Sequence, residues 1–220
     1  MMRTVFDNQL ALLDAQMLVL SSSMEEALVG AIEALETRDV ERARAIVEGD
    51  DDIDHQEREI EGLCLKLLLT QQPVAGDLRR VSAALKMVGD MERIADQAAD
   101  IAEIVITLEG EQFDPKLHKH LAKMGRRAAT IVHDAADAFV KRDEERARQA
   151  IVEDSGVNEM FDRVKRDIVK GIQSATDPAT NLVEALMVAK YLERVGDHAQ
   201  NIAEWVEYSI TGRYKGELLG

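Results

Sequence analysis

Hydrophobic residues near the start of the chain follow one another in alternating steps of three and four. The series extends from about Val5 to Glu36 and comprises Leu10, Leu13, Met17, Leu20, Met24, Ala27, Ala31 and Ala34. This spacing puts the hydrophobic side chains on one face of an α-helix, as in the seam of a helical bundle. The pattern therefore predicts a long first helix.

Two more helices are predicted in the first half of the chain. The second spans about residues 40–70, with Ile53 and Ile60 among its inward-facing positions. It ends before Pro73, because a proline disfavours the helical conformation of the residue before it. The third helix continues to about Leu108, and Asp77 or a neighbour is its expected N-cap.

The pattern restarts after residues 110–115, which contain a glycine, a proline and polar residues. The seam of the first helix returns at a constant offset of 104, so that Met17 corresponds to Leu121. The turn sequence TRDVERAR also returns, as KRDEERAR at 141–148. A repeat of this length indicates duplicated domains and not a solenoid.

The second half is expected to repeat the three helices of the first. Its middle helix ends before Asp177-Pro178, its last helix spans about residues 180–209, and the final residues form a frayed tail. Short connections favour antiparallel neighbours. We therefore predict an all-α fold of two tandem antiparallel three-helix bundles, residues 1–110 and 111–220, related by an internal repeat of about 104 residues.

Composition narrows the class of protein. Three prolines, few aromatic residues and abundant Ala, Leu, Glu and Arg are typical of helices. A formal net charge of −15 argues against nucleic acid as a partner, because a phosphate backbone requires a basic surface. The single cysteine, Cys64, lies in an apolar run and is expected to be a small buried hydrophobe. Without a disulfide framework, a signal sequence or a membrane-spanning stretch, the expected location is the cytoplasm.

Candidate chemistry lies in a sequence that occurs twice, ERIADQAADIAE at 92–103 and ERVGDHAQNIAE at 193–204. On a helix its acidic residues fall on one side, opposite the hydrophobic residues of the same helix. They are Glu92, Asp96, Asp100 and Glu103 in the first copy, and Glu193, Asp197 and Glu204, with Asn201, in the second. This geometry predicts two acidic stripes that face away from the core of their own bundle.

Three interpretations of the stripes remain open. The first is a solvated polar face, which is what most runs of charged residues form. The second is a docking patch for a basic partner. The third is a metal site, because acids at i and i+4 repel one another with no basic residue interleaved, and small residues such as Ala95 and Gly196 leave room beside them. Carboxylate oxygens suit magnesium, manganese, calcium or iron.

Other candidates carry weaker signals. Glu33 and Asp137 occupy equivalent positions in the two repeats and are possible additional ligands, and His133 precedes Asp137 by one turn. His198 is expected at the surface or behind Asp197. An acid-rich run comprises Asp50, Asp51, Asp52, Asp54 and His55. It is expected to be solvated, and its counterparts in the second repeat are Asp154 and Asn158. Arg93 and Arg194 are expected to orient the stripes or relieve their charge.

The sequence shows no catalytic constellation. It lacks the paired Glu-x-x-His motifs of di-iron bundles, a glycine-rich phosphate loop and a Gly-x-Ser-x-Gly motif. A buried cysteine is a poor nucleophile. A binding or regulatory protein without a catalytic residue or an organic cofactor is therefore the expected class.

Taken together, these motifs resemble the PhoU family of phosphate-signalling proteins. The similarity covers almost the whole chain and includes PVAGDLRR at 73–80, ALKMVGDMERIAD at 84–96 and AKYLERVGDHAQNIAE at 189–204. It implies a cytoplasmic negative regulator of the phosphate-starvation response. Such a protein links the ATPase subunit of a phosphate ABC transporter to a sensor histidine kinase, touches the membrane only through these partners, and commonly forms a homodimer.

The resemblance also implies metal ions on the Glu-x-x-x-Asp motifs, with iron, zinc, manganese or magnesium as candidates. The corresponding ligands here are Glu92 with Asp96, extended by Asp100, and Glu193 with Asp197. Asn201 replaces the acid at the position of Asp100, so the first site is expected to bind metal more tightly. Two alternatives are a protein whose main role is metal binding and a plain helical adaptor without metal.

Overall fold

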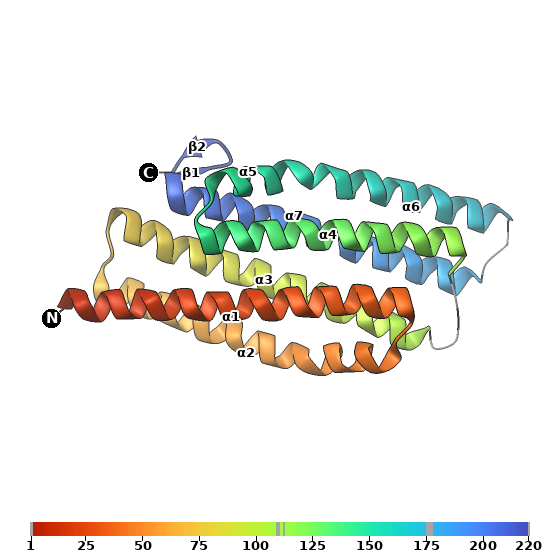
Figure 1. Cartoon of the computed structure of the whole chain (residues 1–220), viewed down its shortest axis with the longest axis horizontal. Coiled ribbons are helices and arrows are strands. Elements are labelled where there is room, and N and C mark those ends of the chain that lie inside the picture. The colour runs from red at the N-terminus through yellow and green to blue at the C-terminus, as the bar shows by residue number, and fades with distance from the viewer. Residues whose placement is uncertain (1, 109–110, 112, 175–177, 220) are drawn as a thin grey trace.

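The computed structural model describes residues 2–108, 111, 113–174 and 178–219. Over these ranges the chain forms seven helices and one small hairpin (Figure 1). The elements are α1 (Met2–Thr37), α2 (Val40–Gln71), α3 (Ala75–Thr107), α4 (Pro115–Lys141), α5 (Glu144–Glu153), α6 (Ser155–Ser174), α7 (Ala179–Thr211), β1 (Arg213–Tyr214) and β2 (Glu217–Leu218).

The helices form two antiparallel units that lie side by side (Figure 1). The first unit contains α1, α2 and α3, and the second contains α4, the α5–α6 pair and α7. The units meet where α3 packs against α7 and α1 against α4. Buried residues from both units, including Met17, Met91, Leu121 and Leu192, form one continuous core. The predicted all-α fold of two tandem three-helix units is confirmed.

The turns that join the first two helices of each unit are built in the same way. Arg38 and Arg142 both have a positive φ, 62° and 52°. The next residue in each repeat, Asp39 or Asp143, accepts backbone hydrogen bonds as the N-cap of the following helix. The N-cap of α3 differs from expectation, because it is Val74, without a side-chain cap, and Asp77 lies inside the first turn.

The middle helix of the second unit is divided into two helices, whereas a continuous helix was predicted. α5 ends at Glu153 and α6 begins at Ser155, with the buried Asp154 between them. The amide of Val157 donates to the carbonyl of Asp154 at 2.9 Å, a spacing of three residues where an α-helix has four. The predicted end of this helix before Asp177, like most of the predicted 110–115 boundary, lies outside the described residues.

The C-terminal residues are ordered against α7, so the prediction of a frayed tail is wrong. The ring of Tyr214 stacks on that of Trp205, with centroids 4.1 Å apart. Lys215 Nζ lies 3.2 Å from Oε2 of the buried Glu204. Gly212 and Gly216, with φ of 80° and 83°, allow the chain to reverse direction.

Two further expectations concern burial and membranes. Cys64 is fully buried, as predicted, and burial raises the pKa of its thiol to about 12. Within the described ranges, no helix combines the length and the apolar character that a membrane span requires.

Because Trp205 is the only tryptophan of the sequence, its fluorescence reports on the docked hairpin. We expect Tyr214→Ala to shift this emission to longer wavelength, to increase quenching by acrylamide and to lower stability by about 0.5–1.5 kcal/mol, since a stacked partner is lost. Glu217→Gln, an exposed change in the same hairpin, is the control. Emission and quenching equal to those of the unaltered protein would contradict the stacked arrangement.

Candidate metal centre

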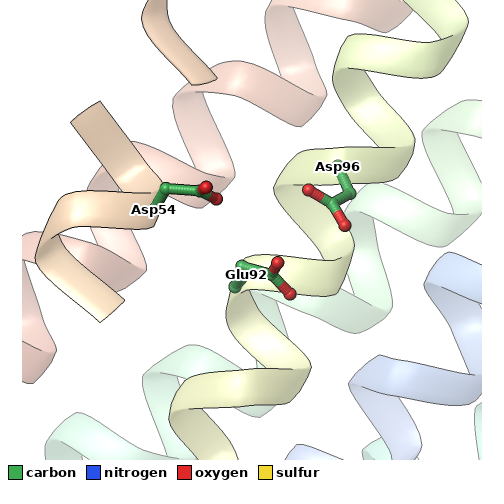
Figure 2. Close-up of side chains that lie close together, drawn as sticks. All are labelled: Asp54, Glu92 and Asp96. Carbon is green, nitrogen blue, oxygen red and sulfur yellow. The ribbon is translucent and has the colours of Figure 1, made fainter. Parts of the chain in front are cut away.

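Three carboxylates from two helices of the first unit lie close together. Glu92 and Asp96 stand one turn apart on α3, and Asp54 points toward them from α2 (Figure 2). One oxygen from each of the three groups lies within 4.8 Å of the others. All three residues are half-buried. The structure therefore joins part of the first predicted stripe to an acid from the neighbouring helix.

The electrostatic state of the cluster follows from its burial and its crowding. Burial, and then the charge of Asp96, raise the pKa of Glu92 to about 7 against the opposing effect of Arg93. Burial, followed by the charges of Asp96 and Asp54, raises the pKa of Asp50 to about 6. Asp50 is therefore exposed to the negative potential of the three-carboxylate cluster. Arg93 contacts Glu92 at 3.1 Å and Asp96 at 2.7 Å, in agreement with its expected orienting role. Arg58 of α2 also contacts Asp54, at 3.5 Å. Two guanidinium groups thus accompany the acids Asp50, Asp54, Glu92 and Asp96, so a net negative charge remains.

Two members of the acid-rich run are not simply solvated, contrary to expectation. Asp51, Asp52 and His55 are exposed, whereas Asp50 and Asp54 are half-buried. The latter two stand one turn apart on the side of α2 that faces the α3 stripe. Their i, i+4 spacing is the same as that of Glu92 and Asp96, and this was the available sequence signal.

The stripe is also less exposed than the helical pattern suggests. The side chains of Glu92 and Asp96 retain only 17% and 26% of their accessible surface, because α2 covers one flank of α3. Asp100 lies further along α3, toward the second unit. Burial, Glu103 and Asp96 raise its pKa, and Arg194 of α7 opposes them. The three-carboxylate group thus includes Glu92 and Asp96 but not Asp100.

The second stripe has a different neighbour. Asp154, at the break between α5 and α6, lies near Glu193 and Asp197 of α7, and their charges add to burial in raising its pKa. Asp154 is 5% exposed, and its Oδ1 accepts no hydrogen bond, while Oδ2 accepts one from Asn158 Nδ2 at 3.0 Å. A Cβ at Gly196 would lie 2.5 Å from that Oδ1, so the glycine makes room for the carboxylate.

Asn201 and His198 of α7 contact the first unit. Both cross to α3, where Asn201 Nδ2 donates to Asp90 Oδ1 at 3.1 Å and His198 Nδ1 lies 2.8 Å from the same oxygen. These residues therefore join the two units. Asp90 was not predicted as a functional residue, because an isolated acid on α3 gives no sign of a partner more than a hundred residues away.

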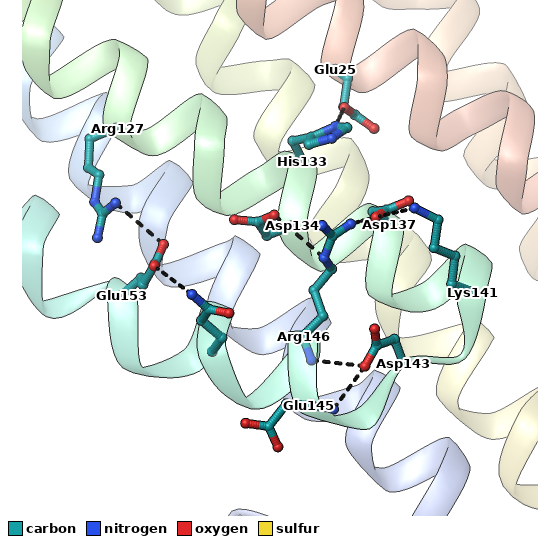
Figure 3. A network of polar contacts seen from close by, with 11 residues as sticks. Glu25, Arg127, His133, Asp134, Asp137, Lys141, Asp143, Glu145, Arg146 and Glu153 are labelled. Carbon is teal, nitrogen blue, oxygen red and sulfur yellow. Dashed lines mark hydrogen bonds and ion pairs between the residues drawn. The ribbon is translucent and has the colours of Figure 1, made fainter.

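The other candidate ligands serve as ion-pair partners. Glu33 pairs with Arg42 at 2.5 Å. Asp137 pairs with Arg146 and, at 2.8 Å, with Lys141 (Figure 3). The suggested pairing of His133 with Asp137 is not found, because His133 Nδ1 lies 2.9 Å from Glu25 on α1.

The first cluster fits a hard divalent cation. Its donors are carboxylate oxygens from two helices, the donor type that magnesium, manganese, calcium and iron prefer. Zinc sites more often include histidine or cysteine, and the three-carboxylate group has neither. Burial, and then neighbouring acids, raise the pKa of Glu92 and Asp50, and the positive charge of a bound cation would oppose both effects.

The fold and the cluster define a class of duplicated helical-bundle proteins that carry acidic stripes on the last helix of each repeat. The family model of the PhoU domain matches residues 18–105 and 121–206, one match in each repeat. The chain therefore belongs to the PhoU family, as the sequence motifs indicated.

The chain is similar to its relatives over most of their length. The chain is 34% identical to a phosphate-specific transport system accessory protein PhoU homolog of Clostridium acetobutylicum, covering 97% of both chains. It is 34% identical to PhoU homolog 1 of Thermotoga maritima, covering 97% of this chain and 92% of the relative. The crystal structure of PhoU from Pseudomonas aeruginosa superimposes with a TM-score of 0.91 at 30% identity, covering 94% of this chain and all of that one.

The raised pKa of Glu92 predicts how stability depends on pH. The folded state holds this proton more tightly than the unfolded chain, so the related stability is full below about pH 4.5 and is lost as the pH rises through about 7. We expect metal-free protein to lose on the order of 1 kcal/mol across this window, after allowance for solvent screening.

Urea unfolding at both ends of that window measures the loss. Glu92→Gln should reduce the pH dependence, because the group that titrates is removed, while Glu159→Gln, at an exposed acid of the second unit, should preserve it. An unchanged dependence in Glu92→Gln would contradict the assignment.

Proposed function

We propose that this protein regulates phosphate transport through protein contacts and without catalysis. The observation that carries the proposal is the match of both repeats to the PhoU domain, with a carboxylate cluster on the repeated helix. The C. acetobutylicum relative is named as an accessory protein of a phosphate-specific transport system. A solved relative from Streptococcus pneumoniae, 27% identical with a TM-score of 0.86, is titled a phosphate transport system regulatory protein.

The proposed partners are the ATPase subunit of a phosphate ABC transporter and a sensor histidine kinase. In this proposal the protein holds the kinase in the state that keeps the starvation response off when phosphate is plentiful. It acts in the cytoplasm, as a homodimer, and reaches the membrane only through its partners. The charge of −15 supports protein surfaces or cations as ligands in preference to nucleic acid.

The carboxylate cluster is proposed as the metal-dependent part of this contact. Asp54, Glu92 and Asp96 would hold the ion, with Asp50 beside them, and the bound ion would supply positive charge to an otherwise acidic surface. The residues join α2 to α3, so they would fix the relative position of two helices. Glu193 and Asp197, with Asp154 nearby, occupy the corresponding position in the second unit.

A reporter experiment tests the regulatory role. Deleting the gene should raise the output of a phosphate-starvation promoter in phosphate-rich medium, because the kinase is no longer restrained. Supplying the unaltered gene on a plasmid should restore repression. Output that stays low in the deletion strain would exclude the proposed role.

Metal binding is tested by titrating purified protein with Mn²⁺. Asp54→Asn should weaken binding on the order of tenfold or more, because one of three charged donors is lost. Asp51→Asn is the matched control, since Asp51 is an exposed acid on the same helix outside the cluster. Equal weakening in both variants would indicate only a general effect of surface charge.

These experiments separate three functions. A protein that binds metal while its deletion leaves the reporter unchanged would favour a metal-binding role. Derepression on deletion, with full complementation by Asp54→Asn, would favour an adaptor that acts without metal. Derepression together with failure of that variant supports the regulator with a metal-dependent contact.

A further inference from the structure

The two carboxylate sites occupy equivalent positions in the repeat but differ in charge. Glu92 and Asp96 on α3 correspond to Glu193 and Asp197 on α7. The helices opposite them diverge. Along α2 the first site has Asp50, Asp54, Glu57 and Glu61, and the equivalent positions near the second site are Asp154, Asn158, Phe161 and Lys165. At these four positions the second site has lost three acids and gained a lysine, while Asp162 replaces Arg58, the partner of Asp54.

The stripe helices also differ one turn before the repeated glutamate. Lys190, one turn before Glu193, stands where α3 has Gly89. The ammonium of Lys190 forms an ion pair with Glu193. Burial and Glu193 raise the pKa of Asp197, and Lys190 opposes them. A positive charge thus already reaches both acids of the second motif.

The residue that replaces Glu57 also favours a cation. Phe161 on α6 lies with its ring centroid 5.5 Å from Lys190 Nζ, within the range of a cation–π contact. In the first unit, Glu57 has its pKa raised by burial, by Glu61 and by Asp54. The second unit thus has the Lys190 ammonium beside an aromatic ring at the place where the first unit has several neighbouring carboxylates.

On α3, the position that corresponds to Lys190 is Gly89, so no ammonium reaches Glu92 from there. The first site has a different extra cation, Arg58 of α2, which lies 3.5 Å from Asp54 and whose counterpart in the second unit is Asp162. Around Gly89, an added Cβ would meet no atom within 4 Å, so space is present at the position of the lysine. Arg93 contacts Glu92 and Asp96, but its counterpart Arg194 is also present in the second unit. Arg93 therefore does not compensate for the missing lysine.

One oxygen of the second site remains without a partner. Asp154 is 95% buried as judged by its 5% exposure, and its Oδ1 accepts no hydrogen bond. Lys190 is paired with Glu193 and not with this oxygen. Removal of the lysine would leave Asp154, Glu193 and Asp197 as oxygen donors of the kind that a hard cation prefers. Their oxygens do not all lie within 4.8 Å of one another, so a bound cation would have to draw them together.

We propose that Lys190 is the resident cation of the second carboxylate site and determines which of the two sites takes a metal ion. The first site, with open space at Gly89, recruits a divalent cation from solution. The second, with the lysine present, does not. This inference rests on the proposed metal binding at Asp54, Glu92 and Asp96.

The experiment reads each site separately with Mn²⁺, whose free form is counted by electron paramagnetic resonance. In the background Glu92→Gln/Asp96→Asn, which disables the first site, the protein should bind Mn²⁺ weakly. Adding Lys190→Ala to this background should tighten binding on the order of tenfold or more, because a competing charge is removed. Lys165→Ala is the matched control, since Lys165 also lies near the Phe161 ring, at 5.9 Å, but has no ion pair with the stripe.

The reciprocal change tests the first site. Gly89→Lys in the otherwise unaltered protein should weaken Mn²⁺ binding by a similar factor, and alanine at the same position should not. Circular dichroism and Trp205 fluorescence confirm that each variant is folded. Lys190→Gln, which keeps a polar side chain, should reproduce the gain of Lys190→Ala.

The outcomes separate the two proposals. Failure of unaltered protein to bind Mn²⁺ would remove the metal from the proposed function. Tighter binding when Lys190→Ala is added to the Glu92→Gln/Asp96→Asn background would still support the role of the lysine. Equal binding in that background with and without Lys190 would overturn the inference. So would tightening of the same size from Lys165→Ala, since the effect would then be general to positive charge.

Discussion

The packing of α3 against α7 is the contact on which the rest of the structure depends. It joins the two units through the last helix of each repeat, and the other helices of each unit then cover its flanks. The two helices are antiparallel, since Asp90 meets Asn201 while Asp100 lies near Arg194. This places both acidic stripes at the margins of one central pair of helices.

That position explains the electrostatic character of the stripes. Side chains at the margin of a helix contact are partly shielded from water, and shielding disfavours the charged form of a carboxyl group. Asp90 contacts His198 and Asn201 of the other unit, and Asp100 lies near Arg194. Glu92 and Asp96 face Asp54 of the neighbouring helix α2, and both contact Arg93. The fold thus concentrates unbalanced charge at one place.

The sequence predicted the helices well because hydrophobic periodicity directly reports which face of a helix is buried. It predicted Glu92 and Asp96 as site residues because their pattern repeats. It did not predict Asp54, since the choice between Asp51, Asp52 and Asp54 depends on the rotation of α2 against α3, a tertiary property. The break at Asp154 was also missed: a single three-residue hydrogen bond leaves no periodic trace.

The difference between Gly89 and Lys190 also bears on molecular orientation. A duplicated chain whose halves were alike would look the same to a partner after rotation by half a turn. Here one long edge carries α2 with its acids, and the opposite edge carries α6 with Phe161 and Lys165 (Figure 1). A charged partner can therefore distinguish the α2 edge from the α6 edge, so it can bind in one orientation despite the internal repeat.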